Sequence, residues 1–474
     1  MALRISRSLL PLVALSIASC GGGDTSPSTT GTSTETTTSS GSGTTDTLPG
    51  PEHPNFVLIL GEARGWTSTS VLEDTDVPDS KSAIFETPTL DGLAADGLTF
   101  ADFYAPSPRC MPSRASYLTG KSPAQLHMTF IPEGNKDGQV AGNVVPPITV
   151  TDLPTTHLTV GALLKGVGYR TAHFGKWHAG QTDPSMYGFD QSDGPTTNKG
   201  PSGEDHPNPT QAYATADRGV DFMKASVAAG TPFYLQISHY GGGDPVDSLP
   251  DTYAAESARL AGQDPKDIAD AAIIRDMDTT IATVLQALED LGIAGNTYVF
   301  FTADHGRAGT SANPPLKMGK GTVWEGGIRV PLFVRGPGVA KGVHTHVRAT
   351  QVDLFPTIAA LAHAPGPLPD GLEGGSLTGV LATATGSVER PREEFVVHFP
   401  HYDKDPLGPA SAILFGDFKL VRYYEDGSLH LFNLAQDLGE DNDLAATAPG
   451  QAAELDQRMT DYLTAVGAQI PGHK

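Results

Sequence analysis

Apolar segments that alternate with helical patterns constrain the fold of this chain more than any other feature. The segment Phe56 to Leu60 is unbroken and ends at Gly61, which is typical of a strand buried on both faces of a parallel sheet. Further strands are predicted at 98–104, 169–174, 233–238, 297–302 and 328–334, and helices at 89–97, 157–166 and 267–291. Strands that alternate with helices predict an α/β domain with a doubly wound, mostly parallel sheet.

The pattern changes near Gly366. Short strands at hairpin spacing are predicted from there on, followed by an amphipathic helix at about 451–466. The strands are predicted at 395–399, 412–414, 418–423 and 429–433. We therefore expect a large domain at residues 53–365 and, at residues 366–474, a smaller α+β subdomain with an antiparallel sheet and one helix.

The N-terminus has the features of an export signal. Arg4 and Arg7 precede an apolar stretch at residues 9–17, which is too short to span a membrane as a helix. The run Ile17-Ala18-Ser19-Cys20 resembles a bacterial lipobox, in which the cysteine becomes the lipidated first residue of the mature protein. Cys20 is therefore predicted to carry a lipid.

Residues 1–19 are thus predicted to be a lipoprotein signal peptide. Residues 20–52 are rich in Gly, Ser and Thr and nearly free of apolar residues, which predicts a disordered tether. We expect an exported bacterial lipoprotein, held to a membrane by its lipid in the periplasm or at the cell surface. Gly21 after Cys20 favours the outer membrane.

The charge and the cysteine count exclude some classes of partner and fold. A formal net charge of −23 makes nucleic acid an unsuitable partner, so any anionic substrate must be bound by local cations. Of the two cysteines, Cys20 is assigned to lipidation and Cys110 to chemistry. No pair is left for a disulfide, so the fold must depend on its apolar core.

Cys110 opens the run Cys110-Met111-Pro112-Ser113-Arg114. Proline two residues after Cys110 favours the start of a helix there, and Arg114 lies one turn further on. A helix N-terminus combined with an arginine is suited to an anion. A lone thiol is more commonly a buried structural residue, and the rest of the motif decides between the two interpretations.

This run, followed by Leu118-Thr119-Gly120, resembles the signature of the formylglycine-dependent type I sulfatases, which belong to the alkaline phosphatase superfamily. Two C-terminal segments, 416–420 and 431–437, resemble the C-terminal subdomain of the same enzymes. The resemblance covers about residues 55–463. It implies an alkaline-phosphatase-like α/β fold.

Candidate polar residues follow the predicted strands, where ligands bind in open α/β sheets. Taken singly, each is typical of a solvated loop, but their joint occurrence around Cys110 is not. They are Glu62, Lys176, His178, Asp304, His305 and Lys320.

The resemblance implies catalytic roles for five residues. Cys110 is oxidised to formylglycine by a maturation enzyme, and one hydroxyl of the hydrated aldehyde attacks sulfur. Arg114 holds this hydrate, while Lys176 and Lys320 bind sulfate oxygens where charge develops. His178 takes a proton from the second hydroxyl, so that sulfate is expelled.

The resemblance also implies a divalent cation, usually calcium, bound by Glu62, Asp304 and His305. The sequence departs from the family here, because Glu62 and Ala63 stand where the family usually has two adjacent aspartates. One carboxylate is missing, the other is longer by a methylene, and His305 stands where the family often has asparagine. Weaker calcium binding or a different divalent metal is expected.

A second departure concerns the acid that protonates the leaving alcohol. The family typically has a histidine where this chain has Gly243, and its loss would cost on the order of 10²–10⁴-fold in rate. We expect His239 and His401 to contact the substrate. The candidates to replace the missing acid are His239, Asp244, His398 and His401.

The resemblance predicts a sulfuric ester hydrolase, and the exported location favours a sulfated carbohydrate as substrate. One alternative is a phosphodiester or phosphonate hydrolase with the same anion site. Another is a degenerate sulfatase that binds sulfated glycan without cleaving it, which the departures at Ala63 and Gly243 favour.

Overall fold

The computed structural model describes residues 50–132, 142–198, 210–242, 245–308 and 313–474. The predicted signal peptide, Cys20 and nearly all of the predicted tether lie outside these ranges, as do Gly243 and Asp244. Residues 46–474 form one compact unit. Among the helices of the described ranges, none is both long enough and apolar enough to span a bilayer.

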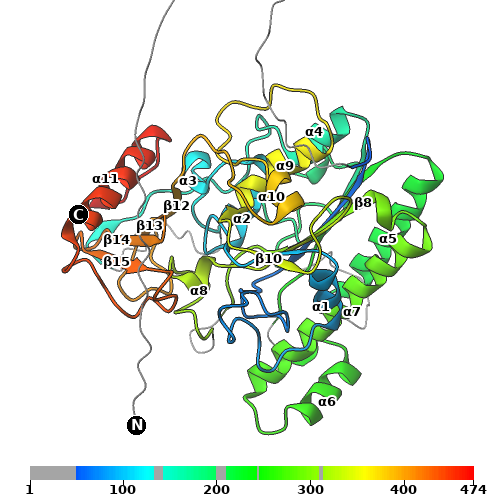
Figure 1. Ribbon diagram of the computed structural model, residues 1–474, viewed down its shortest axis with the longest axis horizontal. Coiled ribbons are helices and arrows are strands. Elements are labelled where there is room, and N and C mark those ends of the chain that lie inside the picture. The colour runs from blue at the N-terminus through cyan, green and yellow to red at the C-terminus, as the bar shows by residue number, and fades with distance from the viewer. Residues whose placement is uncertain (1–49, 133–141, 199–209, 243–244, 309–312) are drawn as a thin grey trace, which may run out of the picture. The chain divides into compact units, whose positions relative to one another are not determined.

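The predicted doubly wound sheet is confirmed (Figure 1). Eight strands lie in the order β10-β2-β9-β8-β1-β7-β5-β6, with β1 near the centre and parallel to both β7 and β8. The sheet is mixed, because β9 runs antiparallel to its two neighbours. The strands are β1 (Asn55–Gly61), β2 (Leu98–Phe100), β5 (Arg170–Gly175), β6 (Gln191–Ser192), β7 (Phe233–Ser238), β8 (Thr297–Ala303), β9 (Leu332–Arg335) and β10 (Val343–Thr345).

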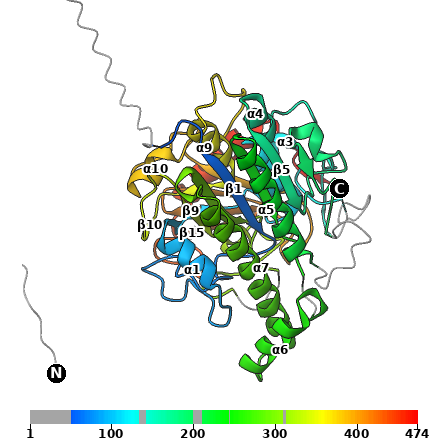
Figure 2. The ribbon, with the colours of Figure 1, turned by 90° about the vertical axis from the view of Figure 1, so that its right-hand side faces the viewer.

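Helices cover both faces of this sheet. Figure 2 shows α5 and α7 lying across one face in front of β1, and their apolar residues form one core with those of α1. The opposite face is covered by α2, α4, α9 and α10, whose buried residues form a second core. The helices are α1 (Pro88–Ala95), α2 (Cys110–Thr119), α3 (Pro123–Leu126), α4 (Val160–Gly166), α5 (Ala212–Ala228), α6 (Pro250–Arg259), α7 (Pro265–Asp290), α9 (Leu354–Leu361) and α10 (Thr378–Thr383).

Two predicted strands differ from the structure. The strand predicted at 98–104 is interrupted after β2, and its end forms β3 (Phe103–Tyr104), which pairs with β11 (Ala349–Thr350) in a separate two-stranded sheet. The strand predicted at 328–334 begins only at Leu332, as β9, and Ile328 is instead the last residue of one helical turn, α8 (Glu325–Ile328). Arg329 contacts both segments that depart from the predictions. It donates to the Ala101 carbonyl and pairs with Asp102 directly after β2, and it pairs with Glu325 at the start of α8.

The predicted C-terminal antiparallel sheet is also confirmed. Its strands are β12 (Phe395–Phe399), β13 (Ala410–Phe415), β14 (Phe418–Tyr423) and β15 (Leu429–Asn433), each paired with the next. Helix α11 (Pro449–Ala465) packs on one face through Leu455 and Met459. A short pair, β4 (Val144–Val145) and β16 (Gly472–His473), joins the C-terminal end to an earlier segment.

Candidate active site

Three parallel strands end at the same edge of the large sheet, and each is followed by a candidate residue. Strand β1 leads to Glu62, β5 leads to Lys176, and β8 leads to Asp304. Strand β1 pairs in parallel with β8 and with β7, and β7 pairs in parallel with β5, so the carboxyl ends of the three strands meet at one edge. The sequence-based expectation that the three residues lie together is met by the geometry described below.

Cys110 is the first residue of α2. Arg109 precedes it in an extended conformation, and Pro112 lies in the first turn, as the sequence predicts. Every residue of α2 is buried. The helix ends at Gly120, whose φ is +67° and where a Cβ atom would lie 2.7 Å from Leu372 Cδ2. A helix packed so tightly holds Cys110 in a fixed place.

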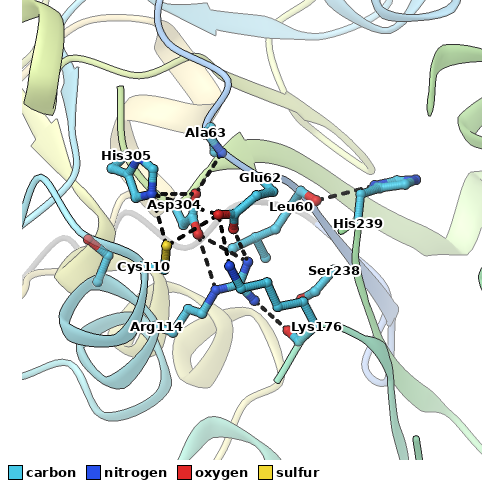
Figure 3. Close-up of polar contacts among 12 residues, drawn as sticks. Leu60, Glu62, Ala63, Cys110, Arg114, Lys176, Ser238, His239, Asp304 and His305 are labelled. Carbon is cyan, nitrogen blue, oxygen red and sulfur yellow. Dashed lines mark hydrogen bonds and ion pairs between the residues drawn. The ribbon is translucent and has the colours of Figure 1, made fainter. Parts of the chain in front are cut away.

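The Cys110 sulfur lies beside Glu62 and His305 (Figure 3). Its Sγ is 3.2 Å from Glu62 Oε1, 3.1 Å from His305 Nε2 and 3.5 Å from Lys320 Nζ. Burial and Glu62 would raise the pKa of the thiol, but the charges of Lys176 and Lys320 outweigh them and lower it well below its usual range. The position is therefore one that favours a negative charge.

Two buried carboxylates face three cations around this sulfur. Glu62 lies 2.8 Å from Lys176 Nζ, 3.0 Å from Arg114 Nη2 and 3.5 Å from Lys320 Nζ. Asp304 accepts hydrogen bonds from Arg114 Nε at 3.2 Å and Nη2 at 3.1 Å. Apart from Cys110 itself, these three cations and two carboxylates leave one positive charge in excess, within a chain whose net charge is −23. This local excess favours binding of an anion.

The two carboxylates have opposite pKa shifts. Burial would raise the pKa of Glu62, but Lys176 and Lys320 hold it well below its usual range. Burial and the charge of Glu62 raise the pKa of Asp304 to about 6. Such divergence between neighbouring carboxylates is typical of functional sites.

The donors Glu62, Asp304, His305 and Cys110 also fit a divalent cation. Their ligand atoms all lie within 4.8 Å of one another. The Nδ1 atom of His305 lies 2.9 Å from the carbonyl of Gly306, which can only accept, so a neutral ring presents its Nε2 lone pair to the cluster. Two carboxylates and one imidazole are ligands that several divalent metals accept.

Gly241 explains how the site accommodates a glutamate at position 62. A Cβ atom at Gly241 would lie 2.7 Å from Glu62 Cγ, closer than side chains pack. The glycine run after β7 thus leaves room for the longer side chain. A glutamate at position 62 therefore needs a residue without a Cβ atom at position 241.

Three residues on the loops around the site have a strained backbone. Ala63, His178 and Met318 have φ values of +54°, +47° and +62°, in the left-handed region that non-glycine residues rarely adopt. The N–H of Ala63 donates to Asp304 Oδ1 at 2.9 Å. His178 is buried on the loop that carries Lys176, and its N–H donates to the Thr196 carbonyl at 2.8 Å.

The structure does not place His239 in the cluster. Its ring is turned away from Cys110 (Figure 3), with Nδ1 3.2 Å from the Leu60 carbonyl and Nε2 3.1 Å from Thr280 Oγ1. Burial lowers the pKa of His239 to about 4. The predicted contact between His239 and the substrate is therefore corrected, because both ring nitrogens already have partners in the interior.

The two C-terminal histidines are likewise engaged in packing. His398 lies between Ser411 Oγ, at 2.7 Å, and the Gln469 carbonyl, at 3.0 Å. His401 stacks on Phe130 with ring centroids 4.8 Å apart, and its Nε2 lies 2.8 Å from Thr129 Oγ1. The predicted substrate contact of His401 is corrected on this ground. Asp244, the fourth candidate acid, lies outside the described residues.

Three residues near the cluster were not predicted from the sequence. Asn198 accepts a hydrogen bond from Lys176 Nζ at 2.6 Å, and nothing in its Gly/Thr-rich surroundings indicates this. Arg109 and Asp403 form a two-fold hydrogen-bonded ion pair directly before Cys110. The position of Arg109 next to the Cys110 motif could have marked it as a site residue. No such signal exists for Asp403, which is 294 residues from Arg109 in the sequence.

Two family models match this chain. Residues 54–364 match the model described as sulfatase. Residues 318–469 match the model described as N-sulphoglucosamine sulphohydrolase, C-terminal.

Two curated relatives are similar over most of the chain. N-acetylgalactosamine-6-sulfatase of Sus scrofa is 32% identical over 351 residues, which cover 66% of this chain and 63% of the relative. This match thus spans less than two thirds of the relative's length. A sulfatase of Formosa agariphila is 30% identical over an alignment 495 positions long, which covers 87% of this chain and 88% of the relative.

Solved structures share the fold. Ps i-CgsB, solved in complex with k-i-k-neocarrahexaose, superposes with a TM-score of 0.70 at 23% identity and covers 87% of this chain and 93% of its own. The phosphonate monoester hydrolase of Agrobacterium radiobacter superposes with a TM-score of 0.63 at 18% identity, covering 87% and 95%. At these identities, the structures establish a common architecture.

Proposed function

Because this chain belongs to the sulfatase family, we propose that it hydrolyses sulfate esters carried by carbohydrates. The observation that carries the proposal is the excess positive charge around Cys110, which three cations supply in an otherwise acidic chain. A carbohydrate is supported by the names of two similar proteins, an N-acetylgalactosamine-6-sulfatase and a protein solved with a neocarrahexaose.

The cations have separable roles in this proposal. Arg114 is fully buried, and its ion pairs with Asp304 and Glu62 fix its position. Its proposed role is to orient the side chain at position 110. Lys320 is 16% exposed at its side chain, so it reaches the incoming ester, and Lys176 binds a second sulfate oxygen. His178, on the Lys176 loop, is assigned the proton transfer that releases sulfate.

Cys110 carries a thiol here, and its sulfur marks the place of the reacting group. When Cys110 is oxidised to formylglycine by a maturation enzyme, its hydrated aldehyde supplies the hydroxyl that attacks sulfur. The site around this position supports the assignment, because Lys176 and Lys320 stabilise negative charge there.

Calcium or another divalent cation is proposed to bind to Glu62, Asp304 and His305, where it would neutralise the charge of the sulfate group. Glu62→Ala is expected to weaken divalent binding at least ~10-fold, because it removes one of two carboxylate ligands. Calorimetric titration with Ca²⁺ and with Mn²⁺ measures this and ranks the two metals.

Glu454→Ala provides the control for this titration, because Glu454 is a half-exposed residue of α11 that pairs with its helical neighbour Arg458. Its affinity for both metals is expected to match that of the wild type. Equally tight binding by wild type and by Glu62→Ala would contradict the metal assignment.

Matched esters test the proposed reaction against its alternatives. We expect the matured protein to release sulfate from N-acetylgalactosamine 6-sulfate much faster than phosphate from the corresponding 6-phosphate. A faster release of phosphate would instead favour the phosphoester hydrolase. Binding of the sulfated sugar without release of either anion would favour a protein that only binds glycan.

We also propose that residues 1–19 direct export and that Cys20 carries a lipid, as the lipobox-like run indicates. Cys20→Ser is expected to move the protein from the membrane fraction to the soluble fraction and to abolish its labelling by a radioactive fatty acid. Persistence of the label in Cys20→Ser would contradict the lipid assignment.

A further inference from the structure

An ion pair joins the residue before Cys110 to the loop that follows β12. Arg109 Nε donates to Asp403 Oδ2 at 2.5 Å, and Arg109 Nη2 donates to Oδ1 of the same carboxylate. The side chains are only 12% and 10% exposed. A bidentate pair shielded from water in this way is strong and fixes geometry, unlike a pair on the surface.

The same loop contacts the segment that carries Lys320. A Cβ atom at Gly321 would lie 2.4 Å from Asp403 Oδ2, so the backbone beside Lys320 packs directly on this carboxylate. The N–H of Gly321 donates to the Pro108 carbonyl at 3.0 Å. Asp403 therefore touches both segments that flank the reacting position, the start of α2 and the Lys320 loop.

Further contacts immobilise both partners of the pair. The guanidinium of Arg109 lies 5.7 Å from the centroid of Phe130, and His401 stacks on the same ring. Trp324 Nε1 donates to Asp405 Oδ2 at 2.9 Å, which anchors the loop two residues beyond Asp403. With one edge on Asp403 and one side near Phe130, Arg109 is committed to the protein rather than to a ligand.

The charge of Arg109 acts on Lys320. The two side chains are close enough for their positive charges to repel each other. Asp403 neutralises Arg109. Without Asp403, a bare cation would stand beside the lysine that is proposed to hold the sulfate group.

We propose that Arg109 and Asp403 are positioning residues that hold Cys110 and Lys320 at their working separation. The loop after β12, in the C-terminal part of the chain, is then required for chemistry at the edge of the large sheet. The proposal rests on the proposed sulfatase function, in which Lys320 binds the sulfate group.

A double-mutant cycle with Arg109→Met, Asp403→Asn and the double variant tests the proposal. Each single variant is expected to lower kcat/KM for p-nitrophenyl sulfate by about 10²-fold, through a lower kcat together with a higher KM, because misplacing reacting groups by about 1 Å costs that much. The double variant is expected to be no slower than either single variant, since both remove the same contact. The mass of the peptide spanning position 110 confirms that all variants are equally matured.

The sign of the Asp403→Asn effect separates positioning from direct binding. If Arg109 itself bound an anion of the substrate, Asp403→Asn would free it and raise kcat/KM, while Arg109→Met would lower it. That result, or unchanged kinetics in both variants, overturns the proposal. Lys224→Met is the control, because it removes an ion pair on the surface of α5 whose side chains are 59% and 78% exposed.

A second measurement keeps this test distinct from that of the proposed function. Calorimetric titration with inorganic sulfate needs no turnover. If the wild type hydrolyses no sulfate ester, the proposed function fails, but weaker sulfate binding by both single variants still supports the positioning role. Sulfate affinities equal to that of the wild type in both variants overturn it.

Discussion

Cys110→Ala abolishes sulfate release in this account. Cys110 is the proposed reacting position, and the expected fall in kcat is on the order of 10⁶-fold, the size of effect seen when a covalent nucleophile is removed. The substitution deletes one buried atom, and the free energy of unfolding should fall by only about 1 kcal/mol. Sulfate released from N-acetylgalactosamine 6-sulfate, measured by ion chromatography, gives the rate.

The chain provides a matched control for this variant. Cys20 is its only other cysteine, so Cys20→Ser replaces a cysteine that is assigned to lipidation and not to the reaction. Cys20→Ser should release sulfate at the wild-type rate, and Cys110→Ala should still bind inorganic sulfate through Lys176 and Lys320. Turnover by Cys110→Ala at a rate comparable to the wild type would contradict the assignment of the reacting residue.

Lys419→Met is expected to have the largest effect on stability. Lys419 lies on β14, and its Nζ is 3.0 Å from Glu325 Oε1 and 2.8 Å from Glu440 Oε1. All three side chains are fully buried. Removing Lys419 leaves two buried carboxylates without this cationic partner, so the free energy of unfolding should fall by about 3–5 kcal/mol. Urea denaturation followed by circular dichroism measures the change.

The two carboxylates share the lysine unequally. Burial would raise the pKa of Glu325, but Lys419 and Arg329 lower it, whereas burial raises the pKa of Glu440 to about 7 despite Lys419. Adding Glu440→Gln to Lys419→Met removes the carboxylate that gains a proton more easily. The double variant should therefore be more stable than Lys419→Met alone.

Two results decide whether this cluster stabilises the fold. The exposed pair of Lys224 and Asp221 provides the comparison, and Lys224→Met should change the free energy of unfolding by less than about 1 kcal/mol. A similarly small change in Lys419→Met would contradict the account.

The architecture could be predicted because apolar patterning determines it. The run before Gly61 needs cover on both faces, and only a central strand of a covered parallel sheet provides this. Helix α8 was missed because Glu325, Gly326 and Gly327 form no apolar pattern, and its last residue, Ile328, lies in the predicted strand. Helix α5 was missed because its buried positions are occupied largely by Ala, Thr and Gly, which give a weak periodic signal.

The centre of the site could also be predicted, because its residues follow parallel strands of one sheet, with β8 next to β1 and only β7 between β1 and β5. Glu62, Asp304 and Lys176 therefore converge at one edge of the sheet. The histidines His239 and His401 could not be placed, since the sequence does not show which way a ring turns from its backbone. The contact of Arg109 with Asp403 depends on how two distant segments pack, and no local pattern records that.

The mass of the peptide that spans Cys110, taken from active protein purified from its own host, tests the central claim most directly. The account predicts an aldehyde or its hydrate in place of the thiol. A homogeneous unmodified thiol in protein that hydrolyses sulfate esters would contradict it, because the proposed attacking hydroxyl would then not exist.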